Sequence, residues 1–188
     1  MAGQEVSGHD LVVGGSGMLS GIVTALARQG RHVSVIARDR HRLARLAKTA
    51  AGIAPLAIDY RDADALEGAL LQARWDNGPI TRAVCWFHTA APAIPLAVAR
   101  HVEQVYCHVL GSAVADPSTP TALDHWRASF AIFPQLDYRI AVLGFVLEPG
   151  GRSRWLTHDE ISAGASEALA SGRPLTIVGT VKPWSARP

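Results

Sequence analysis

The sequence is poor in several kinds of residue, and each shortage argues against a class of protein. Charged residues make up 18% and aromatic residues 6% of the 188-residue chain. The only lysines are Lys48 and Lys182, and the arginines are scattered, so we expect no nucleic acid partner. No apolar run reaches the roughly 18 residues of a membrane span, and residues 1–9 lack the apolar part of a signal peptide. We therefore expect a cytoplasmic protein without a membrane partner.

The two cysteines, Cys85 and Cys107, form no pattern that is typical of a zinc or redox site. Each lies inside an apolar run, and no Cys-x-x-Cys pair is present. The histidines His88, His108 and His158 also lack the spacing of metal ligands. We therefore expect buried, reduced thiols and no bound metal.

Aliphatic residues are abundant: hydrophobic residues make up 48% of the chain. This composition is typical of a parallel sheet that helices cover on both faces. The predicted strands are residues 10–14, 32–37, 54–58, 81–87, 102–110, 139–147 and 175–180. The predicted helices are residues 18–29, 39–51, 63–73, 93–100, 122–131 and 157–170, and residues 148–154 are expected to form a glycine-rich turn.

This alternation of strands and helices predicts an α/β fold with right-handed crossovers. We expect a doubly wound parallel sheet of about seven strands in three layers, α/β/α, which is a Rossmann fold. Residues 1–9 are expected to form a flexible N-terminal tail, and residues 10–188 a single domain. Thr157 and Glu160 have the spacing of a capping box at the start of the last helix.

Residues 14–21 (GGSGMLSG) join the first strand to the first helix. A helix N-terminus presents free N–H groups and the positive end of a dipole, and it therefore attracts a pyrophosphate. Glycine lets the backbone turn tightly and approach the phosphates, and a strand–turn–helix unit is the context that a dinucleotide site requires. We predict a bound dinucleotide here; the alternative is a structural turn. The predicted binding residues are Gly14, Gly15, Ser16, Gly17, Met18 and Leu19.

Arg38 follows the second strand, where an acidic residue would bind the ribose hydroxyls of NAD. A guanidinium at that position suits a 2′-phosphate instead, and Arg40 and Arg42 are placed to assist it. We therefore predict NADP as the cofactor, with NAD as the alternative. A plain surface arginine is the competing interpretation.

Two further pairs of residues follow strand ends. Asp59 and Tyr60 follow the third strand and are expected to border the adenine; an Asx turn is the alternative interpretation of Asp59. His88 and Thr89 follow the fourth strand and are expected to bind the cofactor in the cleft of the sheet. A loop without a ligand is the alternative for this second pair.

Taken together, these segments resemble the short-chain dehydrogenase/reductase superfamily over nearly the whole chain. The glycine turn, Ala37-Arg38-Asp39 and Asp59 occur in the order of that family's cofactor half. Residues 88–91 (HTAA) stand where the family has Asn-Ala-Gly, and Ser112 stands where it places its catalytic serine. The segments GGSGML, GFV, SRWLTHDEIS and IVGTVKPW also resemble small bacterial proteins labelled short-chain dehydrogenase. The resemblance implies NAD(P) binding and oxidoreductase activity.

The chain departs from the family pattern at two places that matter. Gly14 and Gly17 fit the TGxxGxxG spacing, but the third glycine position is Ser20. The family's Tyr-x-x-x-Lys pair is absent, because neither lysine follows a tyrosine by four residues. The residue four positions after Tyr138 is Val142. The segment between the fifth and sixth strands is also too short for the two long helices that usually carry the family's dimer contact.

Two residues are left as candidates for acid–base chemistry. Ser112 ends the fifth strand, and His88 is of the side-chain type that changes charge near neutral pH. A capping serine and a satisfied, partly buried histidine are the plainer interpretations. His108 is expected in the core and His158 at a helix start.

Two functions remain open. The favoured one is an NADP-dependent oxidoreductase with atypical catalytic residues that acts on a carbonyl or a double bond. The alternative is a non-catalytic NADP(H)-binding redox sensor or regulatory subunit; a sugar-nucleotide epimerase is less favoured. The expected partner is a small-molecule substrate or none. A homodimer is a further expectation, with residues 182–188 either reaching a neighbour or folding onto their own domain.

Overall fold

Seven parallel strands form the central sheet, in the order β3-β2-β1-β4-β5-β6-β9. The computed structural model describes residues 8–88 and 91–188. The strands are β1 (His9–Val13), β2 (His32–Ala37), β3 (Ile53–Ala57), β4 (Ile80–Trp86), β5 (Val102–Gly111), β6 (Asp137–Leu143) and β9 (Leu175–Val178). The doubly wound parallel sheet expected from the sequence is therefore confirmed.

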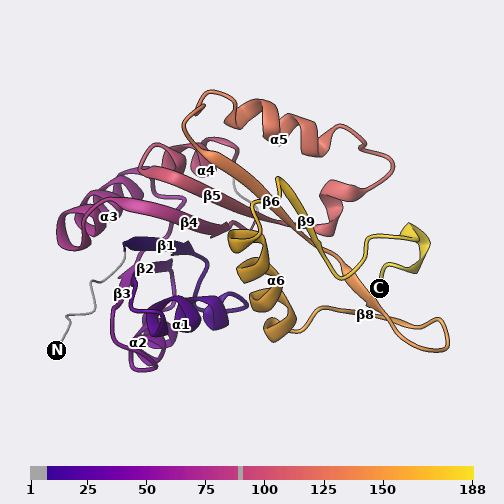
Figure 1. Cartoon of the computed structure of the whole chain (residues 1–188), viewed down its shortest axis with the longest axis horizontal. Helices are drawn as coiled ribbons and strands as arrows, with labels where there is room; N and C mark the ends of the chain where they lie inside the picture. The colour runs from indigo at the N-terminus through magenta and orange to yellow at the C-terminus, as the bar shows by residue number, and fades with distance from the viewer. Residues whose placement is uncertain (1–7, 89–90) are drawn as a thin grey trace.

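Helices cover both faces of this sheet, which gives the three layers visible in Figure 1. One face is covered by α1 (Ser20–Arg28), α2 (Arg40–Ala47) and α6 (His158–Ala170). The other is covered by α3 (Ala63–Asn77), α4 (Ala93–Ala99) and α5 (Ala122–Phe130). Two short 3₁₀ helices, η1 (Ser112–Ala115) and η2 (Trp184–Ala186), complete the chain. None of the helices in the described residues is long and apolar enough to cross a membrane.

The strands are apolar on both sides because each side packs under a different layer of helices. In β1, Leu11 and Val13 belong to the cluster beneath α3 and α4, whereas Val12 belongs to the cluster beneath α1, α2 and α6. All three side chains are fully buried. Successive side chains of a strand point to opposite faces, so a strand between two helical layers must be apolar throughout.

The order of the strands reverses at β1, which pairs with β2 on one side and β4 on the other. The chain leaves β1 for α1 and β2 in one direction and later crosses back to β4. In such sheets a crevice opens beyond the carboxyl ends of the strands at this switch point. The glycine turn and the loop after β4 both lie there.

The prediction of one strand over residues 139–147 is wrong in its second half. β6 ends at Leu143: a Cβ on the next residue, Gly144, would clash with the Thr180 carbonyl oxygen, and Phe145 forms an antiparallel bridge with Thr180 instead of continuing the parallel pairing. The chain then forms an antiparallel hairpin of β7 (Phe145–Leu147) and β8 (Ser153–Trp155). The turn predicted over residues 148–154 therefore contains part of a strand.

Several element ends also differ from the prediction. The first helix begins at Ser20 rather than residue 18, and α3 continues to Asn77. His9, which was assigned to the tail, is buried in β1, where its ring contacts Ser34 Oγ at 2.8 Å. The capping box of Thr157 and Glu160 is confirmed.

Candidate functional site

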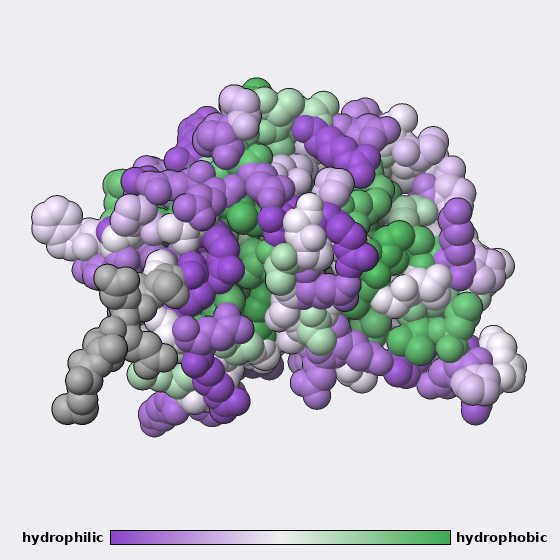
Figure 2. All heavy atoms as spheres, in the orientation of Figure 1, coloured by the Kyte–Doolittle hydropathy of each residue, from purple (hydrophilic) through white to green (hydrophobic). Residues whose placement is uncertain are grey.

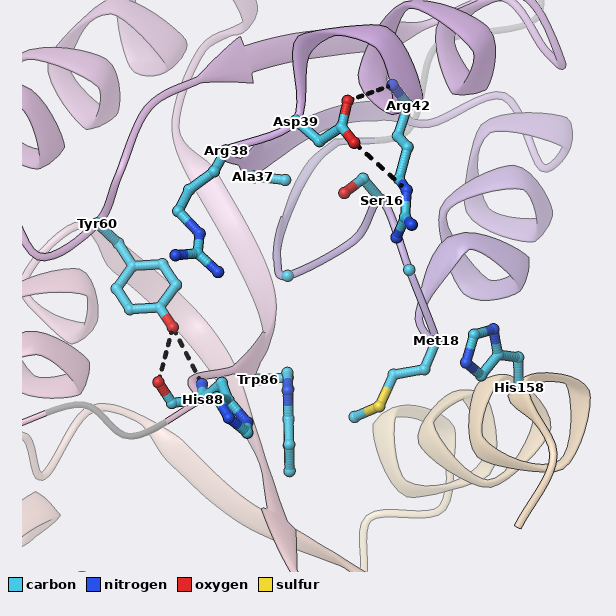
Figure 3. A pocket seen from close by; sticks show the side chains of 12 residues that line it. Ser16, Met18, Ala37, Arg38, Asp39, Arg42, Tyr60, Trp86, His88 and His158 are labelled. Carbon is cyan, nitrogen blue, oxygen red and sulfur yellow. Dashed lines mark hydrogen bonds and ion pairs between the residues drawn. The ribbon is translucent and has the colours of Figure 1, made fainter. Parts of the chain in front are cut away.

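A cleft of about 680 Å³ lies at the switch point of the sheet, and we call it the larger cleft. The glycine turn, the end of β2, the loops after β3 and β4, and the start of α6 all contribute to its wall (Figure 3). Its lining residues are Gly14, Ser16, Gly17, Met18, Ala37, Arg38, Asp39, Arg42, Tyr60, Trp86, His88 and His158. The fold thus brings together most of the residues that the sequence predicts for cofactor binding.

The glycine turn presents its backbone to this cleft. Gly14 has a φ of +79°, and a Cβ there would lie 2.8 Å from the Trp86 carbonyl oxygen, so only glycine fits. No atom lies within 4 Å of a Cβ built on Gly17, so this position faces open space. The N–H groups of residues 15–19 donate to no acceptor in the described part of the chain. A row of such amides before a helix is suited to an anion.

Gly15 and Leu19, which were predicted to bind cofactor, do not line the cleft. Leu19 is fully buried, and a Cβ on Gly15 would lie 2.7 Å from Val35 Cγ1. Both therefore hold the turn against the sheet. From the other side, Ser162 of α6 donates to the Met18 carbonyl oxygen at 2.8 Å.

Arg38 extends from the end of β2 into the larger cleft (Figure 3). No carboxylate of the described residues lies within ion-pair distance of its guanidinium. The neighbouring Asp39 is occupied elsewhere, because its carboxylate accepts the Arg42 N–H at 2.9 Å and lies 3.4 Å from Arg42 Nε. The backbone hydrogen bond from Arg42 lowers the pKa of Asp39. Asp39 thus serves as the N-cap of α2.

Tyr60 and His88 contact each other on the side of the larger cleft that is opposite the glycine turn (Figure 3). The Tyr60 hydroxyl donates to the His88 carbonyl oxygen at 3.2 Å and accepts the His88 N–H at 3.0 Å. These two bonds fasten the loop after β4 to the loop after β3. Thr89 lies outside the described residues.

Asp59 does not line the larger cleft. It accepts the Arg61 N–H at 3.1 Å, which is the Asx turn named above as its alternative, and it pairs with Arg61 Nη2 at 2.6 Å. The hydrogen bonds from the Arg61 side chain lower the pKa of Asp59 to about 2. The geometry therefore gives Asp59 a local structural role rather than contact with an adenine.

A second pocket of about 500 Å³, the smaller pocket, adjoins the larger cleft and shares Trp86 and His88 with it. Its remaining wall comes from the ends of β5 and β6, the β7–β8 hairpin, α6 and the C-terminal segment. Its lining residues are Trp86, His88, Gly111, Ser112, Ala113, Leu143, Gly144, Trp155, Leu156, Ile161 and Arg187. The fold therefore places Ser112 and His88, the two predicted catalytic residues, around one pocket.

Tyr138 and His108 lie away from both sites. The Tyr138 hydroxyl contacts His108 Nδ1 at 3.0 Å, and its ring stacks on Phe130 at 3.9 Å between centroids. Burial raises the pKa of Tyr138 and lowers that of His108 to about 3. Neither group lines the larger cleft or the smaller pocket, and His108 is in the core as expected.

The thiols of Cys85 and Cys107 are free and buried, as predicted. Burial raises the pKa of each to about 12, so both are protonated and unreactive at neutral pH. Among residues 8–88 and 91–188, no three His, Cys, Asp or Glu side chains gather into a metal-binding group.

Trp86 and Arg187 are among the lining residues that the sequence-based predictions did not include. Trp86 is the last residue of β4, and the rule that ligands bind at strand ends near the switch point would have indicated it. Arg187 comes from the C-terminal segment, whose path over the domain no periodicity in the sequence specifies.

No protein-family model matches the chain, and no curated protein matches it either. Many solved structures share its fold. A short-chain dehydrogenase/reductase from Serratia marcescens aligns with a TM-score of 0.71 and 18% identity over 92% of this chain and 97% of its own. A short-chain type dehydrogenase/reductase from Mycobacterium marinum gives 0.74 and 17% over 94% and 95%. A short chain dehydrogenase from Bacillus anthracis gives 0.73 and 13% over 93% and 96%. The chain therefore has the Rossmann-like α/β fold of these proteins.

Proposed function

We propose that the chain binds NADP(H) in the larger cleft and acts as an oxidoreductase on a substrate in the smaller pocket. The observation that carries this proposal is the row of amides at residues 16–18, which donate to no described acceptor at a cleft that two arginines line. Anions bind where free amides and a helix N-terminus converge. The shared fold with proteins titled short-chain dehydrogenase/reductase supports the same assignment.

The residues of the larger cleft fit such a dinucleotide part by part. The glycine-turn amides suit the pyrophosphate, and Arg38 with Arg42 suits a 2′-phosphate. Asp39 is partly engaged by the N-terminus of α2, so the two arginines outweigh its single carboxylate on this side of the cleft. Tyr60 forms the wall on the Arg38 side (Figure 3). NADP is therefore favoured over NAD.

NADPH supplies a hydride when it is bound, and the chain's own residues must supply the rest. Ser112 and His88 border the smaller pocket, where a hydroxyl can donate a hydrogen bond to a carbonyl oxygen and an imidazolium can donate a proton. Leu143, Leu156 and Ile161 form apolar parts of the same wall. Such a wall excludes water from a reacting centre.

A non-catalytic NADP(H) sensor is the second candidate. It is favoured by the lack of a Tyr-x-x-x-Lys pair and by the burial of Tyr138 against His108, away from both sites. The two candidates share the cofactor and differ in turnover.

The variant Gly17→Val tests cofactor binding. A Cβ at this position has no atom within 4 Å, so we expect the fold to be retained while the side chain blocks the path of the phosphates. We expect NADPH, followed by its fluorescence, to bind at least about ten-fold more weakly, a loss of about 1.4 kcal/mol. Gly68→Ala, on the outer surface of α3, is the control and should bind as the wild type does. Unchanged binding by Gly17→Val would contradict the assignment.

Turnover separates the two candidates. NADPH consumption is measured with aldehydes, ketones and conjugated enones, in the wild type and in Ser112→Ala and His88→Ala. Turnover that either substitution reduces supports the oxidoreductase. Tight NADPH binding with no consumption for any of these substrate classes would favour the sensor instead.

A further inference from the structure

Arg187 reaches into the smaller pocket from the C-terminal segment. Its Nε donates to Ser112 Oγ at 2.9 Å, although the two residues are far apart in sequence. The 3₁₀ helix η2 directly precedes Arg187, and the Arg187 N–H donates to the Trp184 carbonyl oxygen at 3.1 Å. The C-terminal segment therefore folds over its own domain beside the β7–β8 hairpin (Figure 1).

The guanidinium of Arg187 makes cation–π contacts with two indole rings. Its central carbon is 5.1 Å from the ring centroid of Trp155 and 5.1 Å from that of Trp184. Contacts of this kind hold a cation on an aromatic face and reduce its contact with water. Arg187 is thus held at the exposed rim of the pocket by one hydrogen bond and two ring contacts.

No anion in the described chain neutralises this cation. Arg187 has no carboxylate within ion-pair distance, and its Nη groups donate to no described acceptor. Asp116 is near enough for Arg187 to contribute to the lowering of its pKa, but the main cause is the hydrogen bond from the Ser118 backbone. The two do not form an ion pair. The fork of the guanidinium is therefore available to a ligand.

Apart from His88 and Ser112, the rest of the smaller pocket is apolar, and its lining carries no acidic residue. Among its lining residues, Arg187 has the one permanent charge, and the larger side chains include Leu143, Leu156, Ile161 and Trp86. On the face seen in Figure 2, hydrophobic surface gathers between α6 and the hairpin, beside the C-terminal segment. A single cation beside apolar walls matches a ligand with one negative charge and a hydrophobic body.

We propose that the smaller pocket binds a small monocarboxylate with an apolar body, and that Arg187 pairs with its carboxylate. Arginine binds planar carboxylates through two parallel hydrogen bonds, whereas a phosphate dianion is usually met by several donors or cations, and this pocket has one cation. The inference deepens the proposed oxidoreductase by naming its substrate class. A carbonyl acid held in this way would place its charged end beside Arg187 and Ser112.

The test uses 3-phenylpropionate and 3-phenylpropionamide, which differ in charge but little in shape. Binding to the full chain is followed by calorimetry and ligand-observed NMR, with and without saturating NADPH. We expect the acid to bind at least about ten-fold more tightly than the amide, since charge-assisted hydrogen bonds from a guanidinium are stronger to a carboxylate than to a neutral amide. Arg187→Ala should remove that preference and Arg187→Lys should retain part of it. Arg173→Ala, on an exposed arginine that pairs with Glu167, is the matched control and should retain all of it.

Three results would overturn the proposal. They are equal binding of acid and amide, including no binding of either; an unchanged preference in Arg187→Ala; and tighter binding of phenyl phosphate than of the acid. NADPH titrated into the same samples separates this inference from the proposed function. An Arg187-dependent preference for the acid without NADPH binding would support the carboxylate site and contradict the proposed oxidoreductase. NADPH binding without a preference for the acid would contradict the carboxylate site and support the cofactor site.

Discussion

At the scale of single residues, Arg38 and Asp39 show how neighbours decide the role of a charged side chain. Both follow β2 and both line the larger cleft. Asp39 is held by the N-terminus of α2, where it accepts the Arg42 N–H. Arg38 has no described carboxylate within ion-pair distance, and its charge makes only a minor contribution to the lowered pKa of Asp59. A dinucleotide in this cleft therefore meets the guanidinium of Arg38, whereas the carboxylate of Asp39 is already hydrogen-bonded to α2. This arrangement favours a 2′-phosphate over a free 2′-hydroxyl.

The variant Arg38→Ala tests this reasoning. We expect NADPH binding to weaken by about ten-fold, because a charge-assisted hydrogen bond contributes about 1.5–3 kcal/mol, while NADH binding changes little. Quenching of tryptophan fluorescence measures both affinities. Arg28→Ala, at the C-terminal end of α1 and outside the cleft, is the control. Equal weakening of NADPH and NADH would argue against selection of the phosphate by Arg38.

The buried His108 predicts how stability depends on pH. The side chain is 1% exposed, and burial lowers its pKa to about 3 from 6.5. Between these values the unfolded chain binds a proton that the folded chain does not, so the free energy of unfolding falls as the pH drops below 6.5, by up to about 1.4 kcal/mol per pH unit. The contribution of neutral His108 is therefore complete above pH 6.5 and is lost toward acid pH.

Urea unfolding at pH 7 and pH 5 measures this dependence in the wild type and in His108→Phe. Between pH 7 and pH 5 the free energy of unfolding should fall by up to about 2 kcal/mol more in the wild type than in the variant. The comparison of the two losses cancels other groups that titrate in the same range, such as His9, whose pKa burial also lowers. Equal losses in the two proteins would show that His108 does not titrate as its burial requires.

Residues next to strand ends were the easiest part of the site to predict. Arg38, Tyr60 and His88 all line the larger cleft, because the carboxyl ends of parallel strands meet at one edge of the sheet. Asp59 is the exception, because Arg61, two residues away, offers it a closer partner. Competition of this kind depends on local backbone geometry, which residue types alone do not specify.

At the scale of elements, two glycines within helices predict opposite effects of the same substitution. Gly164 of α6 packs against β9, and a Cβ there would lie 2.4 Å from both Val178 methyl carbons. Gly68 of α3 has no atom within 4 Å of the same added carbon. The first glycine is required by close packing of a helix on the sheet; the second is not.

Gly164→Ala should lower the free energy of unfolding by about 1–3 kcal/mol, because the core has no room for another methyl group. Gly68→Ala should raise it by about 0.5–1 kcal/mol, because alanine loses less backbone entropy than glycine in a helix. Urea unfolding of both variants measures the two changes. A shift of the same sign in both would contradict the packing of α6 on β9.

The central strands and their helices were predictable because continuous apolar runs and amphipathic stretches differ clearly in period. The β7–β8 hairpin was not. Each strand has three residues, which is too short for an alternating pattern, and β7 continues the apolar run of β6 without a break in composition. The two strands divide at Gly144, which lies so close to the Thr180 carbonyl that a side chain would not fit. This approach joins residues far apart in sequence.

At the scale of the whole molecule, the fold places two sites side by side around Trp86 and His88. The first half of the chain supplies the wall of the larger cleft, apart from His158. The second half supplies most of the smaller pocket, including Arg187 from the C-terminal segment. That segment was expected either to reach a neighbour or to fold onto its own domain, and in the described chain it contacts Ser112 of its own domain. The homodimer stays a prediction, which light scattering of the purified protein would test.

Calorimetric titration of the wild-type protein with NADPH and NADH tests the central claim most directly, namely that the larger cleft is an NADP(H) site. The arrangement of the glycine-turn amides and Arg38 predicts one binding site per chain with a micromolar dissociation constant for NADPH. It also predicts binding of NADH that is weaker by at least about ten-fold. Absence of binding for both dinucleotides would contradict the account and leave a Rossmann-like domain with a different ligand.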